Sequence, residues 1–217
     1  MRKLLLSTAL ATAACAAPAL ANPVISVTDV SIQGDIVTIA GPISPLSVYA
    51  GPLTLTTKLG SIVAWCVDLF HEVQTGSGQN LQYALGTVAT DNASSPSPLS
   101  AAQQTKIANL AAYGQSLIGT AQGTTDNLTA VQLAIWSVEY PTFSYTGASG
   151  APVAATLQQG LSGPGYNTGL LALSGTQTFV TASAGVSSAT APVPEPATLA
   201  LLSGGLALFG VTARRRA

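Results

Sequence analysis

The sequence predicts an α+β fold built around a mainly antiparallel β-sheet, in a sandwich or barrel-like arrangement, with an inserted helical segment. Three observations predict this fold. Short runs rich in β-branched residues fill the chain from residue 24 to about residue 85, two amphipathic helical stretches lie between residues 100 and 140, and strand-like residues return near residue 180. Strands in one block followed by helices favour an antiparallel sheet over the regular β-α alternation of a parallel one.

Five segments of the N-terminal half have the composition of strands. They are residues 24–28, 36–39, 46–49, 53–57 and 61–69. Gln33-Gly34-Asp35 separates the first two and indicates a turn, and Gly51-Pro52 separates the third from the fourth. Segment 61–69 is apolar on both faces as far as Asp68. We therefore expect it to lie centrally in the sheet, with its far end opening toward solvent.

The first helix is predicted to begin after Ser100, because Ser100 and Gln103 have the spacing of a capping box. One stripe of this helix carries small and apolar residues, namely Ile107, Leu110, Ala111, Gly114 and Leu117. Such a stripe predicts that the helix packs against the sheet or against a second helix.

A second helix is predicted after the loop at 119–125, with Asp126 as its cap and Pro141 as its stop. Its apolar stripe follows the spacing i, i+3, i+4, i+7 and contains Leu128, Val131, Gln132 and Ile135. Gln132 is the polar residue on that stripe. Downstream, the sequence predicts a short helix at 153–159, a Gly/Pro-rich loop through residue 169 and a strand near 176–181.

The body of the chain is acidic and nearly lacks basic residues. Five of the seven basic residues lie in the two terminal segments, which leaves Lys58 and Lys106 against seven carboxylates. Such a surface has no positive field for nucleic acid or anionic lipid, so we exclude nucleic acid as a partner. Residues 22–181 are numerous enough for one domain with its own core.

The N-terminal segment has the parts of a signal peptide. Arg2 and Lys3 precede the apolar residues 4–10, and Ala19-Leu20-Ala21 matches the A-x-A pattern of a signal-peptidase site. Residues 1–21 are therefore predicted to be removed by signal peptidase during export. Cys66 then remains as the one cysteine, which excludes an intramolecular disulfide.

The C-terminal segment, residues 193–217, has three parts in order. It begins with Val193, Pro194, Glu195 and Pro196, continues with an apolar run at 199–211, and ends with Arg214, Arg215 and Arg216. Arginines after a hydrophobic helix remain on the cytoplasmic side, which places the preceding chain outside. The Ala/Ser/Thr/Val composition of residues 182–192 predicts a flexible linker before this segment.

This tail resembles the PEP-CTERM sorting signal of Gram-negative bacteria. The resemblance implies that the single hydrophobic helix anchors the chain transiently in the inner membrane and that the membrane protease exosortase recognises and cuts the signal. It also implies that the protein reaches the cell surface or the extracellular matrix.

Two segments far apart in the sequence carry the candidate chemistry, Trp65-Cys66-Val67-Asp68-Leu69 and Val131-Gln132-Leu133-Ala134-Ile135-Trp136. They resemble the paired motifs of thioester domains in bacterial surface adhesins. The resemblance implies an internal bond between Cys66 and Gln132, shielded by Trp65 and Trp136, which an amine on a partner surface opens. Such a bond would also remove a carboxamide whose burial costs about 1–3 kcal/mol when its hydrogen bonds are unmet.

Other interpretations of these residues stay open. Cys66 as a small buried side chain and Gln132 as the partner of a loop backbone require no chemistry. Cys66, Asp68 and His71 have the residue types of a thiol hydrolase, although Cys66 and His71 point to opposite faces if both lie on a strand. Asp68, His71 and Glu72 have the types of metal ligands, but no ligand spacing repeats, and we expect neither a metal nor a cofactor.

The sequence thus predicts an exported cell-surface or extracellular-matrix protein, associated with exopolysaccharide or biofilm, that adheres covalently and is not an enzyme. Its expected partner is an extracellular polysaccharide or an amine-bearing surface. The alternative is a structural or carbohydrate-associated matrix protein with the same fold and no covalent bond, for which four tyrosines offer stacking surfaces, Tyr83, Tyr113, Tyr140 and Tyr145. The third interpretation is an exported thiol hydrolase.

Overall fold

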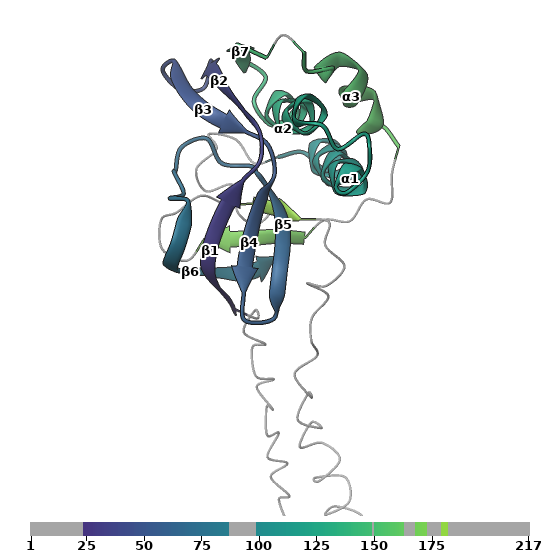
Figure 1. Ribbon diagram of the computed structural model, residues 1–217. Helices are drawn as coiled ribbons and strands as arrows, with labels where there is room; N and C mark the ends of the chain where they lie inside the picture. The colour runs from purple at the N-terminus through teal and green to yellow at the C-terminus, as the bar shows by residue number, and fades with distance from the viewer. Residues whose placement is uncertain (1–23, 87–98, 149, 163–167, 173–178, 182–217) are drawn as a thin grey trace, which may run out of the picture.

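A computed structural model describes residues 24–86, 99–148, 150–162, 168–172 and 179–181 (Figure 1). The predicted signal peptide, the linker at 182–192 and the tail at 193–217 lie outside these residues. The described chain forms a closed barrel, a separate three-stranded sheet and three helices, and every strand pair is antiparallel. The predicted α+β fold with antiparallel sheets is confirmed.

The barrel has six strands and the smaller sheet has three. In barrel order the strands are β1 (Val24–Ile32), β4 (Leu53–Thr57), β5 (Gly60–Cys66), β9 (Phe179–Thr181), β8 (Thr168–Ala172) and β6 (Gly76–Gly86). The smaller sheet has the order β3 (Leu46–Ala50), β2 (Asp35–Ala40) and β7 (Ser144–Thr146). A bulge in β1 between Val27 and Asp29 lets Val27 and Val30 both be buried despite their odd spacing.

The barrel and the smaller sheet share one continuous antiparallel ribbon. Ile32 pairs with Leu53 in the barrel, Asp35 pairs with Ala50 in the smaller sheet, and all these pairs keep the same register. At the bend between the sheets, a Cβ on Gly34 would collide with the carbonyl oxygen of Ala50, and one on Gly51 would collide with the carbonyl of Gln33. The predicted break between the two strands at 33–35 is confirmed, but it is a bend between sheets and not a hairpin turn, and glycine is needed there for a close backbone crossing.

Strand β5 lies between β4 and β9, as its apolar faces predict, but it ends at Cys66 and not at residue 69. The expectation that Asp68 opens toward solvent is also wrong, because its side chain is only 5% exposed. The Asp68 carboxylate turns the chain by accepting the N–H groups of Phe70 (2.9 Å) and His71 (3.3 Å). Solvent exposure begins at Phe70, which is 40% exposed.

The helices are α1 (Ala101–Leu117), α2 (Thr125–Glu139) and α3 (Val153–Gln159). The capping box of Ser100 and Gln103 and the bounds of the short third helix are confirmed. The cap of α2 is Thr124, whose hydroxyl accepts the Asn127 N–H (3.3 Å), and not Asp126, which lies in the first turn. The helix stops two residues before Pro141, as predicted.

The C-terminal strands agree only in part with the prediction. The Gly/Pro-rich segment ends earlier than residue 169, because β8 begins at Thr168, and β9 covers only Phe179–Thr181. β9 lies within the strand predicted near 176–181, which is confirmed there. β8 pairs with β6 and β9 inside the barrel, so its neighbours supply the regular structure that its own composition does not indicate.

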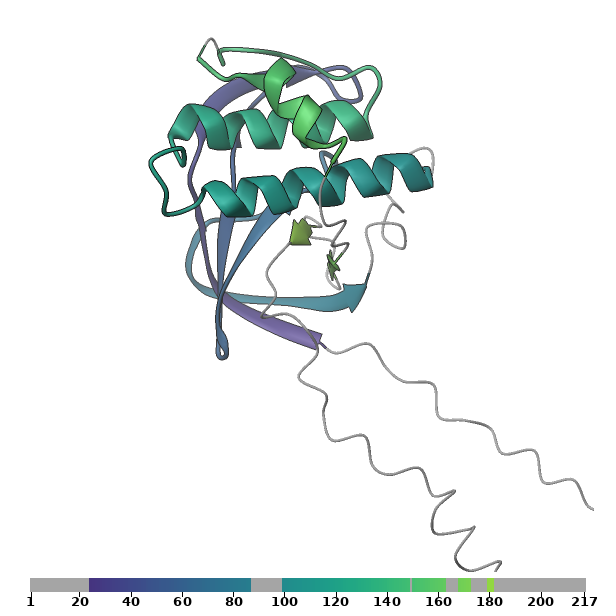
Figure 2. The same cartoon turned by 90° about the vertical axis from the view of Figure 1, so that its right-hand side faces the viewer.

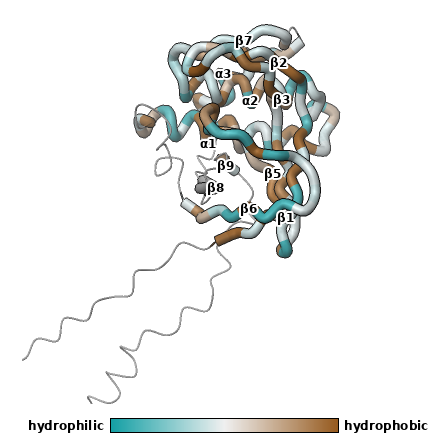
Figure 3. The backbone as a smooth tube through the Cα atoms, turned by 90° about the vertical axis from the view of Figure 1, so that its left-hand side faces the viewer, coloured by the Kyte–Doolittle hydropathy of each residue, from teal (hydrophilic) through white to brown (hydrophobic). Residues whose placement is uncertain are grey.

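The helices pack as a layer against the β-structure. Figure 2 shows α1 and α2 side by side with α3 across them. Trp65 of β5 is fully buried and faces α1, where a Cβ on Gly114 would collide with the indole ring. Hydrophobic stretches, brown in Figure 3, occur where the helices and the strands meet. Within the described residues, no helix has the length and hydropathy to cross a membrane.

Candidate functional site

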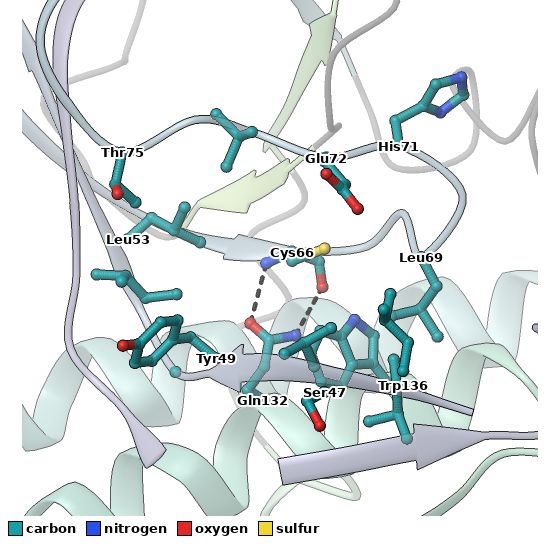
Figure 4. Close-up of a pocket in the computed structure, with 16 residues that line it drawn as sticks. Ser47, Tyr49, Leu53, Cys66, Leu69, His71, Glu72, Thr75, Gln132 and Trp136 are labelled. Carbon is teal, nitrogen blue, oxygen red and sulfur yellow. Dashed lines mark hydrogen bonds between the residues drawn. The ribbon is translucent and has the colours of Figure 1, made fainter. Parts of the chain in front are cut away.

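The structure brings Cys66 and Gln132 together from segments far apart in the sequence. Cys66 is the last residue of β5, and Gln132 lies in the middle of α2 with its side chain fully buried. The Cys66 N–H donates to Gln132 Oε1 (3.0 Å), and Gln132 Nε2 donates to the Cys66 carbonyl oxygen (2.8 Å; Figure 4). The carboxamide is thus held by two hydrogen bonds against the backbone of the cysteine.

The thiol of Cys66 is held in the turn that follows β5. Sγ donates to the Asp68 carbonyl oxygen (3.1 Å) and accepts the Asp68 N–H (3.4 Å). The residue is 3% exposed, and burial raises the pKa of its thiol well above the usual range. Nearby Glu139 and Asp68 raise this pKa further, while the hydrogen bond to Asp68 opposes the shift. Cys66 is therefore a neutral thiol, without the thiolate character of a catalytic cysteine.

The two tryptophans of the motifs lie on different sides of β5. Trp136 is one turn beyond Gln132 on α2, and it lines the same pocket as Cys66 and Gln132. Its indole nitrogen is buried and makes no well-aligned hydrogen bond within the described residues. Trp65 precedes Cys66 on the strand and packs on the opposite face against Gly114 of α1. Only Trp136 therefore lies over the Cys66–Gln132 pair.

His71 pairs with Asp68 through Nδ1 and Oδ2 at 2.7 Å. Figure 4 shows the imidazole directed away from Cys66, while Glu72 points toward it. Cys66 and His71 do not share a strand, because β5 ends at Cys66 and His71 lies in the following loop. Among the described residues, no three potential ligands gather at a metal-binding distance.

A buried carboxyl beside this site escaped the sequence analysis. Glu139 is 4% exposed, and neither of its oxygens makes a well-aligned hydrogen bond within the described chain. Burial raises its pKa well above the usual value of 4.5, and the charge of Asp68 adds to that shift, while neighbouring Tyr140 partly offsets it. Glu139 is seven residues after Gln132, so the helical stripe of α2 could have identified it.

Tyr140 closes the site from the end of α2. Its hydroxyl donates to the Val67 carbonyl oxygen (3.4 Å) and accepts the Leu69 N–H (3.4 Å). Tyr83 is also fully buried, in ring contact with Phe179 at 5.5 Å between centroids. The expectation that the four tyrosines form a sugar-stacking surface is therefore wrong for these two, because a buried ring presents no face to a ligand.

A pocket of about 290 Å³ opens over the pair. Its floor contains Cys66, Gln132 and Trp136, one wall is the strand β3, and the other is the segment from Leu69 to Thr75 (Figure 4). The pocket lining mixes aliphatic residues such as Val48 and Leu53 with polar ones such as Ser47 and Glu72.

Comparison with known proteins identifies the C-terminal tail. A family model described as a PEP-CTERM protein-sorting motif matches residues 192–216, one residue displaced from the predicted segment. No curated protein and no solved structure matches the chain. The motif implies an exported protein that exosortase sorts through a membrane-anchored C-terminal signal.

Proposed function

We propose that this exported protein is a covalent adhesin of the cell surface or the extracellular matrix, and that an internal thioester between Cys66 and Gln132 forms its bond to a partner. The observation that supports the proposal is the hydrogen-bonded docking of the Gln132 carboxamide on the backbone of Cys66, which brings the two residues into contact in a buried site. The sorting motif supports an extracellular role, where a covalent link resists dilution and shear.

The two side chains supply all the atoms that thioester formation requires. Cys66 Sγ forms a bond to Cδ of Gln132, the Cδ–Nε2 bond breaks, and Nε2 leaves as ammonia with the thiol hydrogen. A primary amine on a partner then attacks Cδ. That attack releases the Cys66 thiol and leaves Gln132 joined to the partner by an amide bond.

The environment suits such a bond. A thioester is less polar than the carboxamide that it replaces, which suits the fully buried position of Gln132, and its formation gives up the hydrogen bond from Nε2 to the Cys66 carbonyl oxygen. Exclusion of bulk water from the floor of the pocket slows its hydrolysis. Each molecule reacts once, so the proposal is a binding function and not an enzyme with turnover.

A structural matrix protein without a covalent bond is the second candidate. It is favoured by the same two hydrogen bonds, because they satisfy both Gln132 and the backbone of Cys66 without any reaction. The thiol hydrolase receives no such support, since the His71 imidazole is directed away from the neutral Cys66 thiol.

Incorporation of a biotinylated alkylamine separates the two candidates. The purified full-length chain should take up the amine at Gln132 and release one thiol per amine. Cys66→Ala and Gln132→Ala should both remain unlabelled, while Gln104→Ala, a glutamine change on α1, should label like the parent. Equal labelling of the parent and Cys66→Ala, or no labelling of any of them, would overturn the covalent proposal.

A further inference from the structure

We propose that the open edge of β3 binds an extended peptide of another protein as an added strand, and that Glu72 opposite this edge selects a peptide with a basic side chain. The peptide would lie in the pocket above Cys66. Whether this peptide is also the partner that reacts with the thioester rests on the proposed function. Binding of the peptide to β3 does not require a thioester.

Strand β3 has a partner on one side only. It pairs with β2 and stands at the end of the smaller sheet, and no strand among the described residues pairs with its other edge. Exposed edges are ordinarily protected by a charge, a proline or a bulge. Residues 46–50 read Leu-Ser-Val-Tyr-Ala, contain none of these, and pair with β2 in unbroken register.

The register identifies the backbone groups at this edge. The Gln33 N–H donates to the Pro52 carbonyl oxygen (3.0 Å), which fixes that pair as a hydrogen-bonded one. Hydrogen-bonded and non-hydrogen-bonded pairs alternate along an antiparallel ladder, so Val48 bonds to β2. Ser47 and Tyr49 therefore direct their N–H and C=O groups to the open side. These four groups match those that an added strand requires.

The pocket runs along this edge and also reaches Ile39 of β2 on one face of the sheet. Its lining includes every residue from Leu46 to Tyr49. Side chains of a strand alternate between faces, so a pocket on one face would include only every second residue. The Leu69–Thr75 segment forms the wall that faces β3 across the pocket (Figure 4).

Charge identifies the kind of occupant. Glu72 lines the pocket and points toward Cys66, and no lysine or arginine is present among the lining residues. A basic side chain on the peptide complements this carboxylate. A second copy of this chain would offer its own β3, which has no basic residue. A peptide of another protein therefore fits the slot better than a second copy.

The test uses the full-length chain with Cys66→Ala, so that no covalent bond contributes. Short random peptides displayed on phage are selected on this protein, and the recovered peptides are synthesised. Binding is then measured by fluorescence anisotropy on Ser47→Pro, Glu72→Gln and Asp126→Asn versions of the Cys66→Ala chain. Each peptide is also synthesised as a series of variants, each with a single N-methyl group at a different backbone amide.

We expect the recovered peptides to share a lysine or arginine. N-methylation of every second amide should abolish binding, whereas N-methylation of the amides between them should leave the affinity unchanged. Ser47→Pro, which removes an edge N–H without touching the β2 ladder, should weaken binding at least about tenfold, equivalent to about 1.4 kcal/mol. Glu72→Gln should weaken it several-fold, and Asp126→Asn, the same charge change on α2, should not.

Three results would overturn the inference. One is the recovery of no peptide above the library background. Another is a peptide affinity that does not alternate between successive N-methylated amides. This measurement does not depend on whether Ser47→Pro folds. The last is self-association of the chain that Ser47→Pro abolishes, since this would assign the edge to a second copy. Because Cys66 is absent throughout, none of these results bears on the thioester.

Discussion

The side-chain amide of Gln132 and the backbone of Cys66 form a two-bond ring, with distances of 3.0 and 2.8 Å, that joins the middle of α2 to the end of β5. Both residues are buried, so these bonds are shielded from water. The ring therefore connects the helical layer to the barrel at the floor of the pocket.

Replacement of Gln132 should destabilise the fold. In Gln132→Leu the N–H and C=O of Cys66 stay buried without partners, at a cost of about 1–3 kcal/mol for each group. Ser137→Ala on the same helix is the control, since its hydroxyl bonds only to the Leu133 carbonyl of α2. Urea unfolding of both variants measures the difference in the free energy of unfolding. Equal stabilities of Gln132→Leu and Ser137→Ala would contradict the role of the ring.

Glu139 should make stability fall as pH rises. Its pKa in the fold lies above the usual value of 4.5, so above that pH the unfolded chain releases a proton that the folded chain keeps. Unfolding is then favoured by at most about 1.4 kcal/mol per pH unit, until pH reaches the raised folded pKa. The stability contribution is complete below pH 4.5 and is lost on the alkaline side.

Glu139→Gln should remove this dependence, because the amide stays neutral in both states. Denaturation midpoints across the acidic and neutral range provide the measurement. Cys66 and Tyr140 also lie near Glu139, and burial raises the pKa of both above neutrality. If the stability of Glu139→Gln depends on pH in the same way as that of the parent, a group other than Glu139 causes the dependence.

Gly114 should be intolerant of substitution. An added Cβ would meet the Trp65 ring and approach Val131 Cγ1 to 2.8 Å, so α1 would have to move away from β5 and α2. Overpacking of this kind costs about 1–3 kcal/mol. Gly119→Ala is an unsuitable control because that residue has a positive φ. The control is Ala112→Gly on α1, which should lower the free energy of unfolding by about 1 kcal/mol. A Gly114→Ala protein as stable as the parent would show that Trp65 packs differently.

The Pro-Glu-Pro motif should determine removal of the tail. In a Gram-negative host with its exosortase, replacement of Pro194, Glu195 and Pro196 by alanine should leave the chain uncut and in the membrane fraction. Ser187→Ala with Ser188→Ala in the predicted linker is the matched control and should be processed. Immunoblots of membrane and extracellular fractions read the outcome. Identical processing of both proteins would mean that the motif at 192–216 does not direct cleavage.

Local patterns predicted the helices better than they predicted the β-structure. The capping box at Ser100 and the stop before Pro141 follow from short-range rules, and the structure confirms both. The role of Gly34 was not predicted, because the same residue type serves a turn and a close crossing of two chains, and only the tertiary structure distinguishes them. β8 was missed because its strand character comes from pairing with β6 and β9.

A residue of the site could be predicted from the sequence only where its type did not fit the pattern of the residues around it. Gln132 drew attention as a polar residue on an apolar stripe, and it lies against Cys66. Glu139 lies on the same helical stripe and is also buried, but a carboxylate in the last turn of a helix is usually exposed, so it drew no attention. The β3 edge could not be predicted, because strand order depends on pairings that no single strand encodes.

The mass of the intact protein tests the proposed thioester most directly. The parent chain should be lighter than its sequence requires by one ammonia, whereas Cys66→Ala and Gln132→Ala chains processed in the same way should have the masses of their sequences. A parent chain of full sequence mass, with a Cys66 thiol that alkylates once the protein is unfolded, would contradict the covalent account.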